Sequence, residues 1–320
     1  MSSRLKALLF AVLMLNSGWG FFGHEQINRL AIFTLPPEMI VFYKKHLDYL
    51  MTASVNPDRR RYAVKEEAPR HYIDLDEYGD SAAWKLPKFW SVAVDSIGEE
   101  TLQQHGVVPW HIPRMVHQLR DAFFIQDVDR ILRCSAELGH YVADANVPLH
   151  TTSNHNGQLT GQHGIHGFWE SRLPELFSSG YSYVVGKADY VNDPQERAWL
   201  AVRQAHRCVD SVLRLEKELT LSVGAGKYNY ETKGKQTIRV YSQSFSRQYH
   251  EQLAGMVERQ MRASIKMTAD LWYTAWVDAG QPDLNRLIGY TPSTAEVEQR
   301  KAELEQWKSA RWASREHEHQ

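Results

Sequence analysis

Apolar side chains recur every three to four residues along most of the chain, which is the spacing of one face of an α-helix. The pattern is clearest over residues 127–145, 196–219 and 245–279. Few segments alternate apolar and polar residues as strands do, so the pattern predicts an all-α fold. We expect a single multi-helix domain over residues 19–289. The shorter segments predicted to be helical are 25–35, 37–50, 85–104 and 113–124.

The first eighteen residues have the layout of a secretory signal peptide. A short basic start is followed by an unbroken apolar run at 7–15 and a small, polar exit at 16–18. The apolar run is too short to span a bilayer. Cleavage after Gly18 would make Trp19 the first residue of the mature protein. Since no later stretch is apolar enough for a transmembrane helix, we expect a secreted or periplasmic protein.

Composition and charge narrow the class of protein further. With 43% hydrophobic and 23% charged residues, the chain is typical of a packed globular domain. Removing residues 1–18 changes the net charge from −1 to −3, which argues against a broad cationic face for nucleic acid. Cys134 and Cys208 both lie in helical patterns, where a disulfide and two free thiols are both compatible with the sequence. Two cysteines make neither a disulfide scaffold nor a thiolate metal site.

The sharpest chemical signal lies at the end of the helix predicted over residues 127–145. His140 and Asp144 are four residues apart, so they share one helix face. Pro148 cannot continue a helix, because it lacks an N–H and clashes with the preceding turn. The chain therefore turns there and presents His150 from another direction. Two side chains from a helix face and a third from the following turn suit a compact metal cluster.

A second pair repeats the four-residue spacing. His166 and Glu170, together with His150, would give a zinc ion two imidazoles and one carboxylate and leave a position for water. Singly, each such pair is weak evidence, because a His and an acid at this spacing often make only a surface hydrogen bond. The inference of a metal cluster depends on two pairs in one short stretch with a turn histidine between them.

Two further pieces of sequence offer donors. The α-amine of Trp19, once freed, is easily deprotonated by a metal ion and chelates it together with its own carbonyl oxygen, and His24 can add an imidazole. Asp58 offers a carboxylate and His71 another imidazole. Considered alone, Asp58 would be a turn residue after a proline and His71 a half-buried ring.

Together these motifs resemble the phospholipase C/P1 nuclease superfamily, over most of the mature chain up to the helix predicted to end at residue 279. The resemblance implies three zinc ions, with Asp144 shared between two of them. The implied ligands are Asp58, His71, His140 and Asp144 for one ion, the Trp19 amine and carbonyl, His24 and Asp144 for the second, and His150, His166 and Glu170 for the third.

The resemblance also implies an activity, the hydrolysis of phosphodiester bonds by a metal-activated water. Asp58 would orient that water as a catalytic residue. Asp74 matches an acidic position near the substrate in the nuclease branch, and Tyr72 would be an adjacent aromatic residue able to stack on a base. The three ions would outweigh the charge of their carboxylate ligands, so the cluster itself would attract a phosphate.

The two branches of the superfamily are not separated by the sequence. The segment from Trp19 to His24 and the motif from His71 to Asp74 resemble the nucleases, which favours single-stranded nucleic acid as substrate. Glu170 resembles the phospholipase C branch, so a phospholipid is the alternative. A non-catalytic helical binding protein held by structural zinc is an alternative of another class. We predict no protein partner, and we interpret the charged residues 290–320 as an exposed helix or tail.

Overall fold

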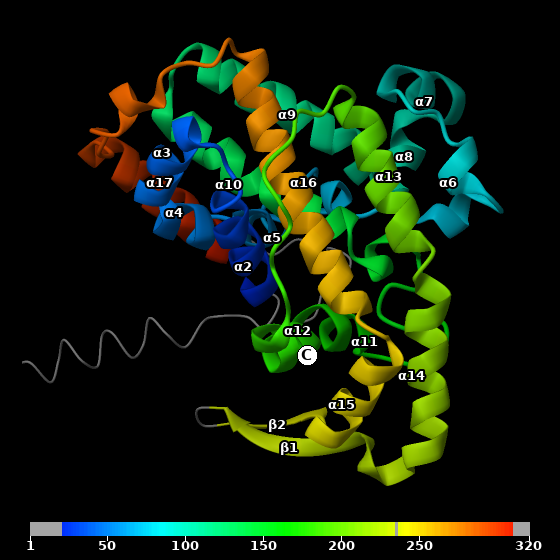
Figure 1. Ribbon diagram of the computed structural model, residues 1–320. Coiled ribbons are helices and arrows are strands. Elements are labelled where there is room, and N and C mark those ends of the chain that lie inside the picture. The colour runs from blue at the N-terminus through cyan, green and yellow to red at the C-terminus, as the bar shows by residue number, and fades with distance from the viewer. Residues whose placement is uncertain (1–20, 234–235, 310–320) are drawn as a thin grey trace, which may run out of the picture.

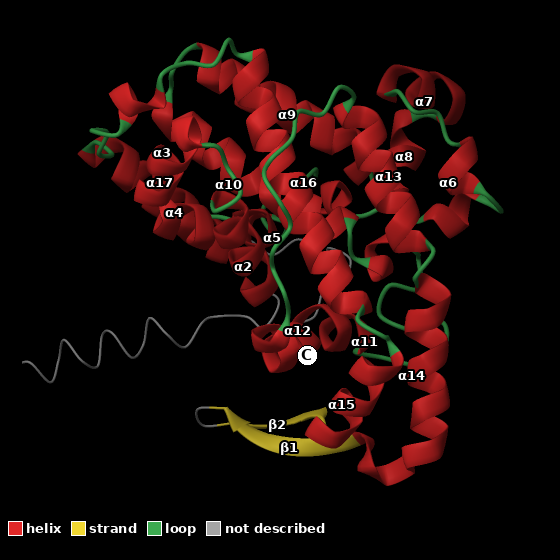
Figure 2. Ribbon diagram, in the orientation of Figure 1, coloured by secondary structure: helices red, strands yellow, loops and turns green. Residues whose placement is uncertain are grey.

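The computed structural model describes residues 21–233 and 236–309 of the chain, and within them helices dominate (Figures 1 and 2). The predicted all-α fold class is confirmed. The predicted signal peptide at 1–18 and the predicted ligand Trp19 lie outside the described residues. No helix in the described part of the chain is both long and apolar enough to cross a membrane.

Long helices from distant parts of the chain form the centre of the fold. α10 begins after Asp127, whose side chain caps the helix by accepting a hydrogen bond from the Arg130 N–H at 3.0 Å. α9 contains Pro113, which cannot donate to the carbonyl of Pro109. That carbonyl accepts instead from the Gln195 side chain of α13, at 2.7 Å. The central helices are α2 (Phe21–Ile32), α9 (Val108–Phe124), α10 (Val128–Ala145), α13 (Pro194–His206) and α16 (Met256–Asp278).

Shorter elements connect and cover these helices. Several of them divide segments that the apolar pattern joined, because the pattern alone does not mark a break between two helices that bury the same face. Ala254 and Gly255 have φ angles of 48° and 75°, and this left-handed turn separates α15 from α16. The remaining α-helices are α3 (Pro37–Lys45), α4 (Leu47–Thr52), α5 (Asn56–Arg60), α6 (Ala82–Lys85), α7 (Trp90–Ile97), α8 (Glu99–His105), α11 (Ile165–Gly167), α12 (Leu173–Phe177), α14 (Val209–Val223), α15 (Gln243–Gln252) and α17 (Thr294–Ser309).

One β-hairpin, which the apolar pattern did not predict, projects at the lower end of the molecule in Figure 1. Its antiparallel strands are β1 (Tyr228–Lys233) and β2 (Gln236–Tyr241). At its base the Tyr241 ring stacks on Phe168 with centroids 3.7 Å apart, and farther along β1 Glu231 pairs with Arg172. Most of its other side chains are polar or exposed, so no apolar alternation marks it in the sequence.

The buried side chains form two hydrophobic clusters. The larger one joins α2, α3, α9, α10, α13 and α16, and the smaller one joins α12, α14, α15 and the start of α16. The end of α10 belongs to the larger cluster, whereas Val147 and Leu149, which follow it, belong to the smaller one. The turn after α10 therefore carries the chain from one cluster to the other. Cys134 is buried in the larger cluster, Cys208 lies between α13 and α14, and both are free thiols.

Gly139 allows α10 to approach its neighbours closely. A Cβ at this position would lie 1.8 Å from Asn28 Oδ1 on α2 and 3.1 Å from Thr268 Cγ2 on α16. Asn28 is buried, and its side-chain amide donates to the carbonyls of Leu50 and Ala136, each at 3.0 Å. A methyl group here would displace this amide from both partners.

Gly139→Ala is therefore expected to lower the free energy of unfolding by about 1–3 kcal/mol, the usual cost of overpacking a core. Thermal unfolding measures the effect. Gly180→Ala is the matched control, because a Cβ at Gly180 meets no atom within 4 Å and its unfolding temperature should not change. Equal unfolding temperatures for the Gly139 variant and the parent protein would contradict the close packing of α10 on α2.

Candidate metal centre

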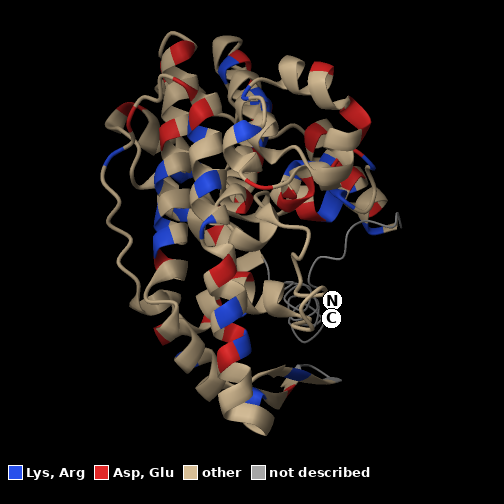
Figure 3. Ribbon diagram, turned by 90° about the vertical axis from the view of Figure 1, so that its right-hand side faces the viewer, with Lys and Arg blue, Asp and Glu red and all other residues tan. Residues whose placement is uncertain are grey.

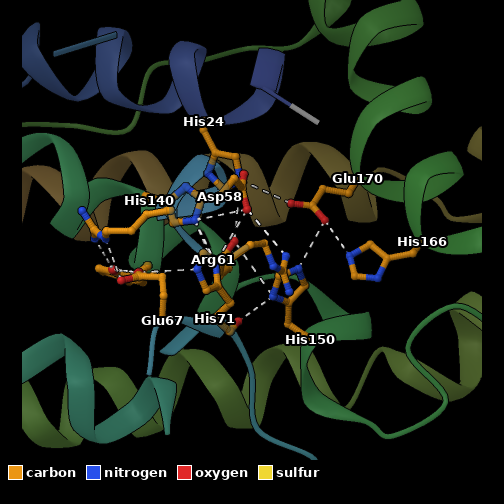
Figure 4. A network of polar contacts seen from close by, with 12 residues as sticks. His24, Asp58, Arg61, Glu67, His71, His140, His150, His166 and Glu170 are labelled. Carbon is orange, nitrogen blue, oxygen red and sulfur yellow. Dashed lines mark hydrogen bonds and ion pairs between the residues drawn. The ribbon is translucent and has the colours of Figure 1, made fainter. Parts of the chain in front are cut away.

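The C-terminal end of α10 and the turn after it place three donors together (Figure 4). His140 Nε2 lies 3.2 Å from Asp144 Oδ2, and both side chains are buried. The chain then turns at Pro148 into a 3-10 turn (Pro148–Thr151) that brings His150 Nδ1 to within 3.9 Å of Asp144 Oδ1. This is the arrangement that the spacing of the three residues predicts.

A segment far away in the sequence adds His71, at the end of a 3-10 turn (Ala68–His71). His71 Nδ1 lies 2.9 Å from Asp144 Oδ2 and 3.0 Å from His140 Nε2. His150 Nδ1–H donates to the carbonyl of His71 at 2.5 Å, and the Ile73 N–H donates to the carbonyl of His150 at 2.9 Å. The first bond fixes the orientation of the His150 ring, so that Nε2 faces Glu170 Oε2, 3.3 Å away.

The third group of donors lies on a continuous helix of three parts. A π-helical turn (Phe168–Arg172) joins α11 to α12, and Glu170 lies within it. π-Turns often occur at functional sites, where they widen the helix locally. Glu170 Oε2 lies 2.8 Å from His166 Nε2, and Glu170 Oε1 lies 3.5 Å from His24 Nε2. The Glu170 side chain therefore spans two groups of donors.

His24 and Asp58 complete the cluster from α2 and α5. His24 Nε2 lies 3.6 Å from Asp144 Oδ1, and its ring stacks on His140 with centroids 4.1 Å apart. Asp58 Oδ1 lies 3.8 Å from both His71 Nδ1 and His140 Nε2. Among the described residues, donor atoms within 4.8 Å of one another form four overlapping trios: His24, Asp58 and His140; His71, His140 and Asp144; His150, His166 and Glu170; and His24, Asp144 and Glu170.

The electrostatics of the cluster favour a positive charge at its centre. Burial opposes the ionised form of Asp144 and Glu170, yet the imidazoles that face them hold the pKa of both carboxyl groups well below its usual range. Burial also opposes protonation of His24, but the carboxylates of Glu170 and Asp144 raise its pKa to about 9. The carboxyl groups are thus ionised, as metal ligands must be.

The chemistry of the donor set fits metal ions. Five imidazoles and three carboxylates supply the nitrogen and oxygen atoms that zinc binds, and converging buried carboxylates require a compensating cation. Two of the trios share no residue: His71, His140 and Asp144 form one, and His150, His166 and Glu170 form the other.

The sequence reasoning missed Arg61, whose guanidinium lies beside the cluster in Figure 4. The residue is 1% exposed, and none of its three guanidinium nitrogens has a hydrogen-bond partner in the described part of the chain. Its Nη1 lies 3.7 Å from Asp58 Oδ1. A buried guanidinium with unused donors is suited to an anionic ligand. The sequence feature that could have identified Arg61 is its position three residues after Asp58.

Glu67 was also missed, although it stands four residues before His71 and so shows the same acid–histidine spacing as the other pairs. Its side chain is fully buried, and Oε1 lies 3.6 Å from His71 Nε2, on the side of the ring that faces away from Asp144. Arg60 Nε and Arg70 Nη1 each donate to Glu67 Oε2 at 2.8 Å, and the Tyr141 hydroxyl donates to Oε1. A carboxylate held in this way orients His71.

The two predicted substrate residues lie next to His71. Tyr72 is buried, and its hydroxyl donates to the carbonyl of Gln104 at 3.3 Å. Asp74 is buried as well, and its backbone N–H donates to the carbonyl of His105 at 2.7 Å. Neither belongs to the four trios, so their contact with substrate stays a prediction.

Helices gathered around a buried cluster of imidazoles and carboxylates define an all-α protein equipped to hold metal ions. A family model described as S1/P1 Nuclease matches residues 19–271. The chain belongs to the S1/P1 nuclease family, whose members are metal-dependent phosphodiesterases, and the resemblance to the phospholipase C/P1 nuclease superfamily is confirmed. None of the curated proteins matches the chain.

Proposed function

We propose that this chain is a secreted hydrolase that uses three zinc ions to cleave phosphodiester bonds in single-stranded nucleic acid. The observation that carries the proposal is the buried cluster of five imidazoles and three carboxylates in a chain of the S1/P1 nuclease family. Glu170, which spans two trios, is a ligand of the third ion in this proposal. The proposed zinc ligands are Trp19, His24, Asp58, His71, His140, Asp144, His150, His166 and Glu170.

The zinc ions, when bound, would acidify a water molecule and neutralise charge on the phosphate. Asp58 orients the attacking water, because its side chain, at 17% exposed, is the most accessible of the three carboxylates. The Arg61 guanidinium donates to the phosphate oxygens on which negative charge increases during attack. Asp74 and Tyr72 lie on the substrate side in this proposal.

Attraction of the substrate is assigned to the cluster and not to the outer surface. Basic and acidic residues both occur along the helices in Figure 3, and the net charge of the chain is −1. The near-neutral chain offers little net attraction for a polyanion, whereas bound metal ions and Arg61 would concentrate positive charge at one point.

The domain arrangement is part of the proposal. A signal peptide at 1–18 is removed, residues 19–289 form the zinc-dependent phosphoesterase domain, and residues 290–320 form a charged C-terminal tail. Cleavage before Trp19 frees the α-amine five residues before His24. α2, which carries His24, begins at Phe21, two residues after Trp19.

The test uses mature protein that begins at Trp19 and carries no N-terminal tag. Bound zinc is quantified, and hydrolysis of single-stranded DNA, RNA, double-stranded DNA and phosphatidylcholine is measured with and without chelator. We expect about three zinc ions per chain and chelator-sensitive cleavage of single strands. A matched protein with one alanine before Trp19 should retain less zinc, because its α-amine is displaced from the cluster.

Each other outcome points to a defined alternative. Preferential hydrolysis of phosphatidylcholine would replace the nuclease assignment by the phospholipase C activity that Glu170 resembles. Zinc retention without hydrolysis of any substrate would favour the non-catalytic, zinc-stabilised binding protein. Absence of zinc would contradict the central proposal.

Glu67→Gln is expected to weaken zinc binding by about 10–100-fold, the usual effect of removing a partner that orients a metal-binding histidine. The variant keeps the shape of the side chain but gives up the negative charge that faces His71 Nε2. Competition with a chromophoric chelator measures the change. Glu196→Gln is the control, because Glu196 also pairs with an arginine, but its side chain is 47% exposed. An unchanged zinc affinity would mean that Glu67 serves the fold and not the metal centre.

A further inference from the structure

A large cavity, lined by none of the eight clustered donors, lies between α17 and the body of the protein. Its volume is about 530 Å³, which is within the range of small-molecule sites. α4, α5 and α10 form one side, and α17, seen beside α4 in Figure 1, forms the other. Since the family match ends at residue 271, this cavity is built partly from a segment that the match does not include.

α17 is held by charges and rings instead of a packed apolar face. It has no buried residue, although a helix that docks only for stability usually buries an apolar stripe. The Arg300 guanidinium pairs with Asp129 and stacks on the ring of Tyr49, 4.4 Å from its centroid. Glu303 lies 3.8 Å from Arg133 on α10. These contacts keep the helix in place and leave the space beneath it open.

The lining of the cavity favours an anion. Its lining residues carry more positive than negative groups, with Arg59, Arg60, Arg133 and Arg300 against Glu137 and Glu303, while Asp129 outside the lining pairs with Arg133 and Arg300.

The four guanidinium groups are not equally engaged. Arg60 forms ion pairs with both Glu137 and Glu67, at 2.8 Å each. Arg59 has no carboxylate within 4.0 Å in the part of the chain that the structure describes, and its Nη1 donates to Asn56 Oδ1 at 3.1 Å. Arg133 Nη2 donates to Asp129 Oδ2 at 3.4 Å, and its Nη1 lies 3.8 Å from Glu303, so its Nε–H has no carboxylate among the described residues. Arg59 and Arg133 therefore retain donors for a phosphate group.

Aromatic rings line the same cavity. Trp307 lies against the Arg60 guanidinium, 5.6 Å from ring centroid to Cζ, and Tyr49 lies beside Arg300. Nucleobases stack on aromatic rings and on the planes of arginine side chains alike. A ligand with one phosphate and one flat base would match both the charge and the rings.

We propose that this cavity binds a mononucleotide, with its phosphate at Arg59 and Arg133 and its base against Trp307. This cavity is separate from the metal centre, and the proposal that it binds a nucleotide does not depend on the proposed hydrolysis. The cavity is nonetheless connected to the metal centre, because Arg60 lines the cavity and also binds Glu67, which faces His71. A nucleotide that shifts Arg60 would alter the support of His71.

The test uses the zinc-loaded chain of residues 19–320 with AMP, adenosine and inorganic phosphate as separate probes. Hydrogen exchange of the α17 backbone amides, followed by mass spectrometry, reports on this cavity and not on the metal centre. We expect AMP to slow this exchange at least threefold, with a smaller effect of phosphate and none of adenosine. Calorimetry with AMP should show one binding event more in the parent protein than in the double variant Trp307→Ala, Arg133→Gln.

The control variant Lys301→Gln, Lys308→Gln changes two exposed residues of the same helix and should respond to AMP like the parent protein. Retained zinc content shows that each variant is folded. Unchanged α17 exchange with AMP in the parent protein would overturn the proposal. So would equal protection by adenosine, or a double variant that binds as many AMP molecules as the parent protein.

Discussion

Replacing Asp144 by Asn is expected to remove metal ions from the centre and to lower phosphodiester hydrolysis by about a thousandfold or more. The Asp144 carboxylate faces His24, His71, His140 and His150 at 2.9–3.9 Å, so it lies in contact with more of the cluster than a ligand of one ion would. Metal ions contribute several kcal/mol of transition-state stabilisation, and each 1.36 kcal/mol is a factor of ten in rate.

Zinc content and kcat/KM, measured on the same preparation, test this prediction. Asp121→Asn is the matched control, because Asp121 pairs with Arg120 on the surface, where an ion pair contributes little. An Asp144 variant that keeps both its zinc and its activity would show that this carboxylate is not a metal ligand.

Arg61→Met is expected to lower kcat by about 100- to 1000-fold and to leave zinc content unchanged. Loss of one donor that stabilises developing negative charge has an effect of this size. The Arg61 guanidinium is buried and its nitrogens have no hydrogen-bond partner in the described residues, so its donors are available to a phosphate. Methionine keeps a similar length and removes the charge.

Arg61→Lys separates charge from geometry. Lysine supplies a point charge without the planar fork of arginine, so it should restore only part of the lost rate. Steady-state kinetics with a dinucleotide substrate, together with zinc analysis, give the result. If the methionine variant loses zinc in proportion to its activity, Arg61 supports the metal centre and does not bind phosphate.

The fold was predicted well where local rules decide it. The apolar stripe over residues 127–145 placed α10 (Val128–Ala145) within one residue. The stripe over 245–279 was continuous in the sequence but is interrupted in the structure at Ala254 and Gly255, where the backbone turns left-handed. The β-hairpin carries too few buried side chains to produce a strand pattern.

The sequence predicted those site residues whose relative positions are set by neighbours within a few residues. His140 and Asp144 share a helix face by spacing alone, and the turn at Pro148 accounts for His150. Arg61 and Glu67 escaped notice because a lone arginine or glutamate in a sequence is most often a solvated residue. Their burial beside His71 and Asp58 depends on how α5 packs on α10.

The sequence by itself determined the helical class, the donor pairs at four-residue spacing and the turn that redirects His150. These features follow from helix periodicity and from the missing N–H of proline, which act over a few residues. The tertiary structure decided the selection of donor atoms by which the five clustered histidines meet the carboxylates, and which charged residues lie next to them. That selection depends on the packing of α2, α5, α10 and α11, which the close approach at Gly139 permits for α2 and α10. Contacts between residues so far apart in the chain are set by how whole helices fill the core.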